Sequence, residues 1–368
     1  MKMSSIILLC FIYTSLHAQL DNKALADSLG KKGIEFMDIG QFEASIAILN
    51  KAKALDPDNQ TYDYEIGLAY YMQENYKEAL KIFKKLTQRA DNEPLYFKML
   101  GNTYDLSGNR KKAKDTYKEG LKKYPDYGPL YLELGLVNMM DKQYTAALFT
   151  WETGILRDPS HASNYYWAAR MTAQSTEKIW ALLYGEIFLN LEPGTRRSQE
   201  ISALLYETYQ NVYKAETDTS GNFKLTERGF TIRMDDALLN KIEKGEQFHL
   251  LPFEGVYAMA FSTAAPLFLQ KNIKLAGIYE ARKIFLDQWF NENNQTYPNT
   301  LFDFQKTLKD KDFFDCYTYW LFSHGSEEEF NTFYENNKSK FEHFVNWINE
   351  NPIVLENGKF CRLHYINQ

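Results

Sequence analysis

The chain has 368 residues, and 42 Lys and Arg against 48 Asp and Glu give it a formal net charge of −6. An acidic balance repels phosphate, so the composition argues against a nucleic-acid-binding protein. Hydrophobic residues make up 45% and charged residues 24%, which excludes a largely disordered chain. The aromatic share of 15% is high. At a prior of about 150 residues per domain, the length predicts two folding units.

Residues 1–18 have the layout of a secretory signal peptide. One basic residue, Lys2, precedes an uncharged apolar run from Ile6 to Leu16, and the segment ends on the small residue Ala18. A membrane anchor is the alternative, but the run is shorter than the roughly 20 apolar residues that span a bilayer. We therefore expect cleavage before Gln19 and an exported protein that is periplasmic, otherwise envelope-associated or secreted.

The chain that remains after this cleavage has two cysteines, Cys316 and Cys361. In an oxidising compartment they could form one disulfide, and the alternative is a pair of buried thiols. The longest remaining charge-free stretch, Gly255–Leu269, is too short to cross a bilayer and predicts a buried helix. We thus expect no transmembrane segment in the mature chain.

The strongest pattern in the sequence is a repeat of 34 residues. Glycines recur at this spacing at Gly33, Gly67, Gly101 and Gly135. Small residues follow twelve positions later at Ser45, Ala79, Ala113, Ala147 and, in a fifth unit, Ala181. Prolines stand near the ends of the units at Pro57, Pro125, Pro159 and Pro193, with Asp91 in this place in the second unit.

These columns resemble the tetratricopeptide repeat. The segments Ile66–Tyr70 and Leu100–Tyr104 are similar to its L-G-x-x-Y core, and Ala79 with Phe83 is similar to its A-x-x-x-F. The resemblance covers residues 26–195 as five units, 26–59, 60–93, 94–127, 128–161 and a degenerate 162–195. It implies an all-α fold, a right-handed superhelical solenoid of antiparallel helix pairs, here followed by an aromatic-rich helical C-terminal domain.

The residues themselves agree with such a fold. Each unit has two segments with apolar positions at helical spacing, and an Asp-Pro or Tyr-Pro pair ends most second segments. No single helix pair can bury its own apolar face, so stacking of neighbouring units must stabilise the array. A further apolar segment at 196–215 is expected to cap its open end.

The resemblance also implies a binding surface, because the first helix of each pair lines the concave side in this family. Carried over by register, the inward positions are Tyr64, Leu68, Tyr71, Met72, Leu95, Lys98, Asn102, Asp105, Leu132, Leu136, Met139, Met140, Tyr166 and Arg170. Aromatic and methionine side chains make adaptable contacts with a partner segment. The alternative is that the C-terminal half of the chain covers this surface.

Lys98 and Asn102 stand where chaperone-binding members of the family begin a clamp for a terminal carboxylate. The following repeats supply Glu133, Leu136 and Ser163 where further polar or basic clamp residues would be expected. The clamp is thus incomplete. The alternative is that the pair is solvated and faces Asp105.

After residue 216 the repeat register is lost. Residues 216–250 read as a linker with a short β-hairpin, because Phe223 with Leu225 and Phe230 with Ile232 alternate around a turn. Helical periodicity predicts one helix within the linker, at Asp235–Glu243. In 251–368 it predicts helices at Phe253–Gln270, Lys274–Asn291, Asn299–Leu308, Phe313–Ser323 and Ser326–Asn349. A hairpin turn is expected near Asn357. Ser326 and Glu329 have the spacing of a capping box.

The sequence gives no support for a catalytic centre, a metal site or a cofactor. It lacks H-E-x-x-H, a zinc-type Cys pair, a Walker loop, G-x-S-x-G and G-x-G-x-x-G. His324 is followed by the acidic run Glu327–Glu329, which more simply complements a helix dipole than binds a metal.

Two functional interpretations remain. The first is a non-enzymatic scaffold or assembly factor of a bacterial cell envelope that binds a protein or peptide partner in the concave groove. The second is a C-terminal domain that binds or hydrolyses a small molecule or glycan, with the repeats as a docking arm. Exposure of Trp289, Tyr317, Trp320 and Trp347 in one concavity would favour the second.

Overall fold

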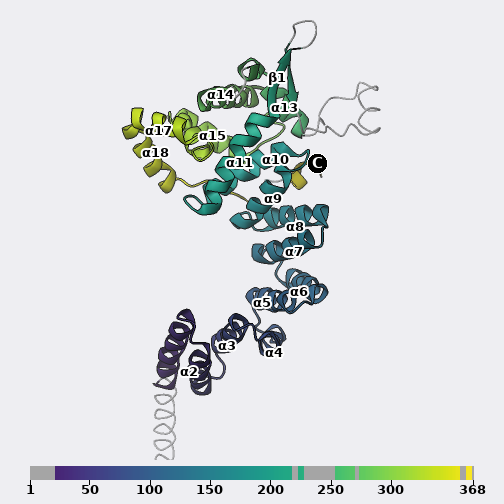
Figure 1. The fold of residues 1–368 in the computed structure, drawn as a ribbon, viewed down its shortest axis with the longest axis vertical. Helices are drawn as coiled ribbons and strands as arrows, with labels where there is room; N and C mark the ends of the chain where they lie inside the picture. Colours follow the sequence, from purple (N-terminus) through teal and green to yellow (C-terminus); the bar gives the residue numbers. More distant parts are fainter. Residues whose placement is uncertain (1–20, 218–222, 228–252, 270–272, 357–361, 367–368) are drawn as a thin grey trace, which may run out of the picture. The chain divides into compact units, whose positions relative to one another are not determined.

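The structure is a computed structural model that describes residues 21–217, 223–227, 253–269, 273–356 and 362–366 (Figure 1). The chain divides into two compact units, one that ends at Val137 and one that begins at Asn138. The predicted helical fold is confirmed for the described residues, which also include one pair of antiparallel strands.

The first unit consists of successive helix pairs. Its elements are a helix over residues 21–38, α2 (Phe42–Leu55), α3 (Gln60–Met72), α4 (Tyr76–Thr87), α5 (Pro94–Leu106), α6 (Arg110–Lys123) and most of α7 (Gly128–Met140). The predicted helix stops hold, since α2 ends at Leu55 and α6 at Lys123. In both cases the next residue, which precedes a proline, leaves the helical region of backbone space.

The small-residue columns are positions of close helix contact. A Cβ atom added to Gly101 would lie 2.1 Å from Cε1 of Tyr117, and one added to Gly67 would lie 2.9 Å from Cε1 of Phe83. Ala79 is fully buried, as are the alanines at the same place in the next three units. In the second and third units an aromatic ring of the second helix thus packs against a glycine of the first helix, and in the first unit Leu49 packs in the same way against Gly33.

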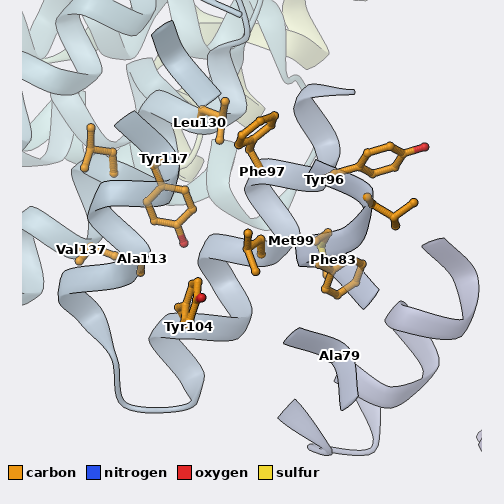
Figure 2. Packing of buried hydrophobic residues seen from close by; sticks show 13 residues of the cluster. Ala79, Phe83, Tyr96, Phe97, Met99, Tyr104, Ala113, Tyr117, Leu130 and Val137 are labelled. Atoms are coloured by element: carbon orange, nitrogen blue, oxygen red, sulfur yellow. The ribbon is translucent and has the colours of Figure 1, made fainter. Parts of the chain in front are cut away.

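One core cluster joins α4, α5, α6 and α7 (Figure 2). Its buried side chains are Ala79, Phe83, Leu86, Tyr96, Phe97, Met99, Leu100, Tyr104, Ala113, Tyr117, Leu130, Leu134 and Val137. The rings fill the space between successive pairs, which accounts for part of the aromatic content of the chain.

The second unit continues the helix pairs and then adds further helices. It contains α8 (Tyr144–Arg157), α9 (Ala162–Ala173), α10 (Lys178–Leu191), α11 (Arg196–Val212), β1 (Tyr213–Thr217), β2 (Phe223–Glu227), α13 (Phe253–Ser262), a 3₁₀ helix η1 (Ala265–Leu269), α14 (Leu275–Glu292), α15 (Thr300–Asp310), α16 (Phe314–Leu321), α17 (Glu327–Asn336), α18 (Lys338–Glu350) and α19 (Arg362–Ile366). The predicted linker at 216–250 does not separate two packed bodies, because residues on both sides of it belong to this unit.

The hairpin differs from the prediction in its register. The strand Phe223–Glu227 pairs with Tyr213–Thr217, which follows α11 directly. The expected capping helix therefore ends at Val212, because the residues after it pair as a strand. The predicted partner at Phe230 and the helix at 235–243 lie outside the described residues, as does the turn at Asn357.

Two predicted C-terminal helices are interrupted. Helix 253–270 ends at Ser262, before Pro266, which cannot donate to a helical carbonyl, and continues as η1. Helix 326–349 breaks at Asn337, whose side-chain Nδ2 donates to the carbonyl of Phe333 at 2.9 Å. In a continuous helix the backbone N of Asn337 would donate to this carbonyl, but it donates to the carbonyl of Tyr334 at 3.1 Å, and the side chain takes its place.

The capping box at Ser326 is also different. The Oγ of Ser326 donates to Oε1 of Glu329 at 3.0 Å and does not bond to a backbone amide of the helix. Oε2 of Glu329 instead accepts from the backbone N of Leu275 at 2.8 Å. The carboxylate therefore joins the start of α17 to the start of α14.

Candidate functional site

The first helices of the first unit carry a surface of apolar side chains. Tyr64, Leu68, Tyr71 and Leu95 pack against the core cluster but remain partly exposed, and Met72 is 47% exposed. We call these five residues the inner face. Together they form an aromatic and aliphatic surface on α3 and α5 that the described residues leave partly open to solvent.

The two tyrosine rings of the inner face pack against neighbouring aromatic rings. The Tyr64 ring lies 6.1 Å from the ring of Phe83 and 6.0 Å from that of Tyr96, measured between centroids. The Tyr71 ring meets the ring of Tyr76 edge-on at 6.1 Å. Such contacts fix the side chains before a partner binds, which lowers the entropy cost of binding.

Lys98 and Asn102 do not form an open clamp. The Tyr117 hydroxyl donates to Oδ1 of Asn102 at 2.6 Å, and Nδ2 of Asn102 donates to Oε1 of Glu133 at 3.4 Å. Burial raises the pKa of the Glu133 carboxyl above its usual value, and the hydrogen bond from Asn102 and the charge of Lys98 offset only part of this effect. The side-chain amide of Asn102 is therefore already hydrogen-bonded on both sides within the chain.

Asp105 is also occupied, because Nε of Arg110 donates to its Oδ1 at 3.1 Å. This ion pair lies within the turn from α5 to α6, and the predicted alternative, in which Lys98 and Asn102 are a solvated pair facing Asp105, stays a prediction for Lys98. On α7, Leu132 and Leu136 are both partly exposed.

The predicted surface residues of the second unit have different environments. Met140 is 53% exposed and Met139 is partly exposed. Tyr166 is only 5% exposed, and its ring packs on Phe188 of α10 with centroids 5.3 Å apart. Its hydroxyl donates to Oε2 of Glu200 on α11 at 2.7 Å and accepts from Nη1 of Arg170 at 2.9 Å. Helix α11 therefore covers this position, which makes it a packing residue.

Sequence reasoning missed two exposed aromatic residues on the second helix α8. Tyr144 is 56% exposed and Phe149 is 57% exposed. Both lie outside the register of first-helix positions, so the family pattern could not point to them.

The C-terminal aromatic residues do not line one common concavity. Trp289 and Tyr317 are fully buried, and Trp320 packs on Tyr317 with centroids 5.8 Å apart. A shallow hollow of about 730 Å³ lies along α18, beside the residue that precedes α16, and is lined by Phe313, Ser339, Lys340, His343, Asn346, Trp347 and Glu350. Only Trp347 of the four predicted residues belongs to it, which removes the stacked platform on which the glycan interpretation depended.

The described part of the chain contains neither a metal-binding cluster nor a membrane-spanning helix. No three His, Cys, Asp or Glu residues among the described ones are arranged to hold an ion, and Nδ1 of His324 lies 3.7 Å from Oε1 of Glu327 on the surface. No described helix has the length and apolar character to cross a membrane. Cys316 is fully buried, whereas Cys361 lies outside the described residues, so the predicted disulfide stays a prediction.

Helix pairs that repeat every 34 residues, with a glycine of the first helix packed against a large side chain of the second at Gly33, Gly67 and Gly101, define a helical-repeat protein. The sequence pattern of the tetratricopeptide repeat family matches residues 31–94. This match confirms, for the residues that it covers, the resemblance seen in the sequence. This is the fold of protein–protein interaction scaffolds.

Several solved structures are similar to the chain. A thermophilic tetratricopeptide repeat protein of Thermus thermophilus is 16% identical, with 49% of this chain and 98% of that chain covered and a TM-score of 0.40. PilF of Pseudomonas aeruginosa is 16% identical, with 52% and 85% covered and a TM-score of 0.43. YrrB, a tetratricopeptide repeat protein with an unusual peptide-binding site, is 22% identical, with 50% and 94% covered and a TM-score of 0.34. No curated protein matches the chain.

Proposed function

We propose that this chain is a non-enzymatic scaffold or assembly factor of the cell envelope that binds a polypeptide segment on the inner face of its first unit. The observation that carries the proposal is the partial exposure of Tyr64, Leu68, Tyr71, Met72 and Leu95 on neighbouring first helices. Apolar side chains that a fold holds at its surface are typical of binding sites.

The chemistry of the inner face suits a peptide with apolar side chains. Met72 has three rotatable side-chain bonds and adapts to different shapes, while the rings of Tyr64 and Tyr71 offer rigid contact area. The hydroxyl of Tyr64 is neutral at physiological pH, as for any tyrosine, and can donate a hydrogen bond to a peptide carbonyl; burial raises its pKa further, to about 12.

A site-specific cross-linking experiment tests the binding surface. A photoreactive phenylalanine replaces Met72 in the full chain, and a matched chain carries it in place of Lys81, which is exposed on the second helix α4. We expect irradiation of producing cells to give one defined polypeptide adduct at position 72 and none at position 81. Tyr71→Ser in the same chain should reduce the yield of this adduct.

The outcome can contradict the proposal in two ways. Equal adducts at both positions would mean that the inner face has no preference over the rest of the surface. An adduct at 72 that Tyr71→Ser leaves unchanged, in a variant with the circular dichroism of the parent, would mean that the ring does not contribute to the contact.

The envelope location has its support in residues 1–18 alone, which have the basic, apolar and small-residue regions of a signal peptide. N-terminal sequencing of the protein recovered from the envelope fraction of producing cells should give Gln19 as the first residue. A chain that keeps Met1 and remains in the cytoplasm would overturn this part of the proposal without affecting the inner face.

A further inference from the structure

Helix α8 of the second unit contains a buried carboxylate that binds an arginine from far along the chain. Glu152 is 0% exposed, and its two oxygens accept from Nε and Nη2 of Arg362, each at 2.9 Å. The Tyr184 hydroxyl on α10 donates to Oε1 of Glu152 at 2.9 Å and accepts from the backbone N of Arg362 at 2.9 Å. Arginine and carboxylate thus meet in the bidentate geometry that a guanidinium favours.

An aromatic pocket lies one helical turn further along the same segment. The ring of Tyr365 stacks on the ring of Phe253, with centroids 4.3 Å apart and planes at 21°. The ring of Trp180 lies 5.9 Å from that of Tyr365. Asn299 donates from Nδ2 to the Tyr365 hydroxyl at 3.3 Å. Arg362 and Tyr365 therefore fill an anionic and an aromatic subsite.

We call Glu152, Tyr184, Trp180 and Phe253 the cradle. It lies on the second helices α8 and α10 and on α13, and none of these residues belongs to the inner face. The segment that it holds, α19, is a helix of five residues. A helix this short has no stability of its own, so its conformation depends on these two anchors.

The cradle requires a guanidinium. Among the described residues, Arg362 is the basic side chain that pairs with Glu152. Removal of this partner would leave an enclosed carboxylate without a counter-charge, which is strongly unfavourable. When α19 leaves, the site is therefore preorganised for another arginine, and a lysine cannot reproduce the two parallel hydrogen bonds.

We propose that the cradle is a second polypeptide-binding site, whose ligand is a partner segment that carries an arginine and, three residues later, a tyrosine. The segment Arg362–Ile366 occupies this site within the chain and competes with the partner. Because the tether raises the local concentration of α19, a partner gains access when its own affinity exceeds this competition or when α19 is released.

A binding measurement with a defined peptide tests the proposal. The probe is the fluorescein-labelled peptide Arg-Leu-His-Tyr-Ile with blocked ends, and the readout is fluorescence anisotropy. The full chain with Arg362→Gln and Tyr365→Ser should bind the probe about ten-fold more tightly than the parent chain, because the internal competitor is gone. Adding Glu152→Gln to this variant should abolish the gain.

Two controls sharpen the result. A probe with lysine in place of arginine should bind the substituted chain at least about ten-fold more weakly, because the bidentate contact is lost. Arg196→Gln makes the same arginine exchange at a side chain that is 92% exposed and should leave probe binding at the parent level.

Three results would overturn the proposal. They are equal affinity of the parent and the substituted chain for the probe, binding that Glu152→Gln does not reduce, and loss of cooperative unfolding in the substituted chain. The last result would mean that α19 is a permanent part of the fold and not a competitor that can leave.

Discussion

Arg282 and Glu186 form an enclosed ion pair that joins α14 to α10. Nη1 of Arg282 donates to Oε2 of Glu186 at 2.9 Å and Nη2 to Oε1 at 2.8 Å, and the two side chains are 5% and 4% exposed. Nε2 of Gln305 on α15 adds a third hydrogen bond to Oε1 at 2.6 Å. One carboxylate of the last repeat thus binds side chains from two helices of the C-terminal half.

We expect Glu186→Gln to lower the free energy of unfolding by about 3–5 kcal/mol, because Arg282 would keep its charge in an enclosed site without a partner. Denaturant unfolding of the full chain, followed by circular dichroism, measures the loss. The matched control is Glu280→Gln on α14, the helix that carries Arg282. Glu280 forms a partly exposed ion pair with Lys283, which contributes at most about 1 kcal/mol.

A second variant separates the charge from the packing. Replacing both members of the pair, Glu186→Leu with Arg282→Met, should cost less than Glu186→Gln alone, since no unpaired charge remains. If Glu186→Gln costs no more than Glu280→Gln, the ion pair does not stabilise the contact between the repeats and the C-terminal helices.

Local patterns could be predicted from the sequence and distant pairings could not. The glycine column marked helix contacts correctly because Gly101 and Tyr117 lie in one repeat, where register alone relates them. Glu186 and Arg282 are 96 residues apart, and no repeat relates the positions around them. Tyr166 fell on the expected register, but Glu200 of a helix outside the array covers it. The register thus predicts the face of a helix but not what packs on it.

A second set of equivalent positions in the repeat was not predicted from the sequence. Gly40, Glu74, Gly108 and Lys142, again 34 residues apart, all have left-handed backbone conformations in the turns between paired helices, with φ of 75°, 58°, 83° and 60°. Two of these residues are not glycine, so their identities did not reveal the column. A side chain other than glycine costs about 1 kcal/mol in this conformation.

Glu74→Gly should therefore raise the free energy of unfolding by up to about 1 kcal/mol, and Gly108→Glu should lower it by about as much. No atom lies within 4 Å of a Cβ built on Gly108, so the effect at this position comes from the backbone alone. Glu119→Gly in the exposed middle of α6 is the control, since the same exchange within a helix destabilises by about 1 kcal/mol. Equal signs for Glu74→Gly and Glu119→Gly would contradict the argument.

Asn102 is expected to stabilise the fold and not to bind a carboxylate. Its Oδ1 accepts from the enclosed hydroxyl of Tyr117, so Asn102→Ala should cost about 1–2 kcal/mol by leaving this hydroxyl without an acceptor. Tyr117→Phe removes the same bond from the other side. In a double-mutant cycle measured by denaturant unfolding, the two losses should not add, with a coupling energy of about 1 kcal/mol.

A strictly additive cycle would show that the two side chains act independently. A variant with normal stability that no longer binds a peptide with a free terminal carboxylate would instead restore the clamp interpretation, because the role of Asn102 would then be recognition. Lys98→Glu supplies the companion measurement, and we expect it to leave partner capture at the inner face unchanged.

The thiol of Cys316 should be unreactive in the folded protein. Burial in α16, with a further contribution from the charge of Asp315, raises the pKa of this thiol from 9.0 to about 12. The thiolate, which is the reactive form, is therefore on the order of 1000-fold rarer at pH 8 than in the unfolded chain. Because folding favours the protonated form, the stabilisation is complete below pH 9 and is lost as the pH rises towards 12.

Maleimide labelling of the full chain with Cys10→Ser and Cys361→Ser, at pH 8 and followed by mass spectrometry, measures this protection. We expect the native protein to react at a rate set by transient opening of α16, and the protein in denaturant to react within seconds. Asp315→Asn tests the cause: it removes a charge that raises the pKa but leaves the burial, so labelling should accelerate only slightly. Native labelling at the denatured rate would mean that solvent reaches Cys316 without unfolding, and would also make the thiol available for a disulfide with Cys361.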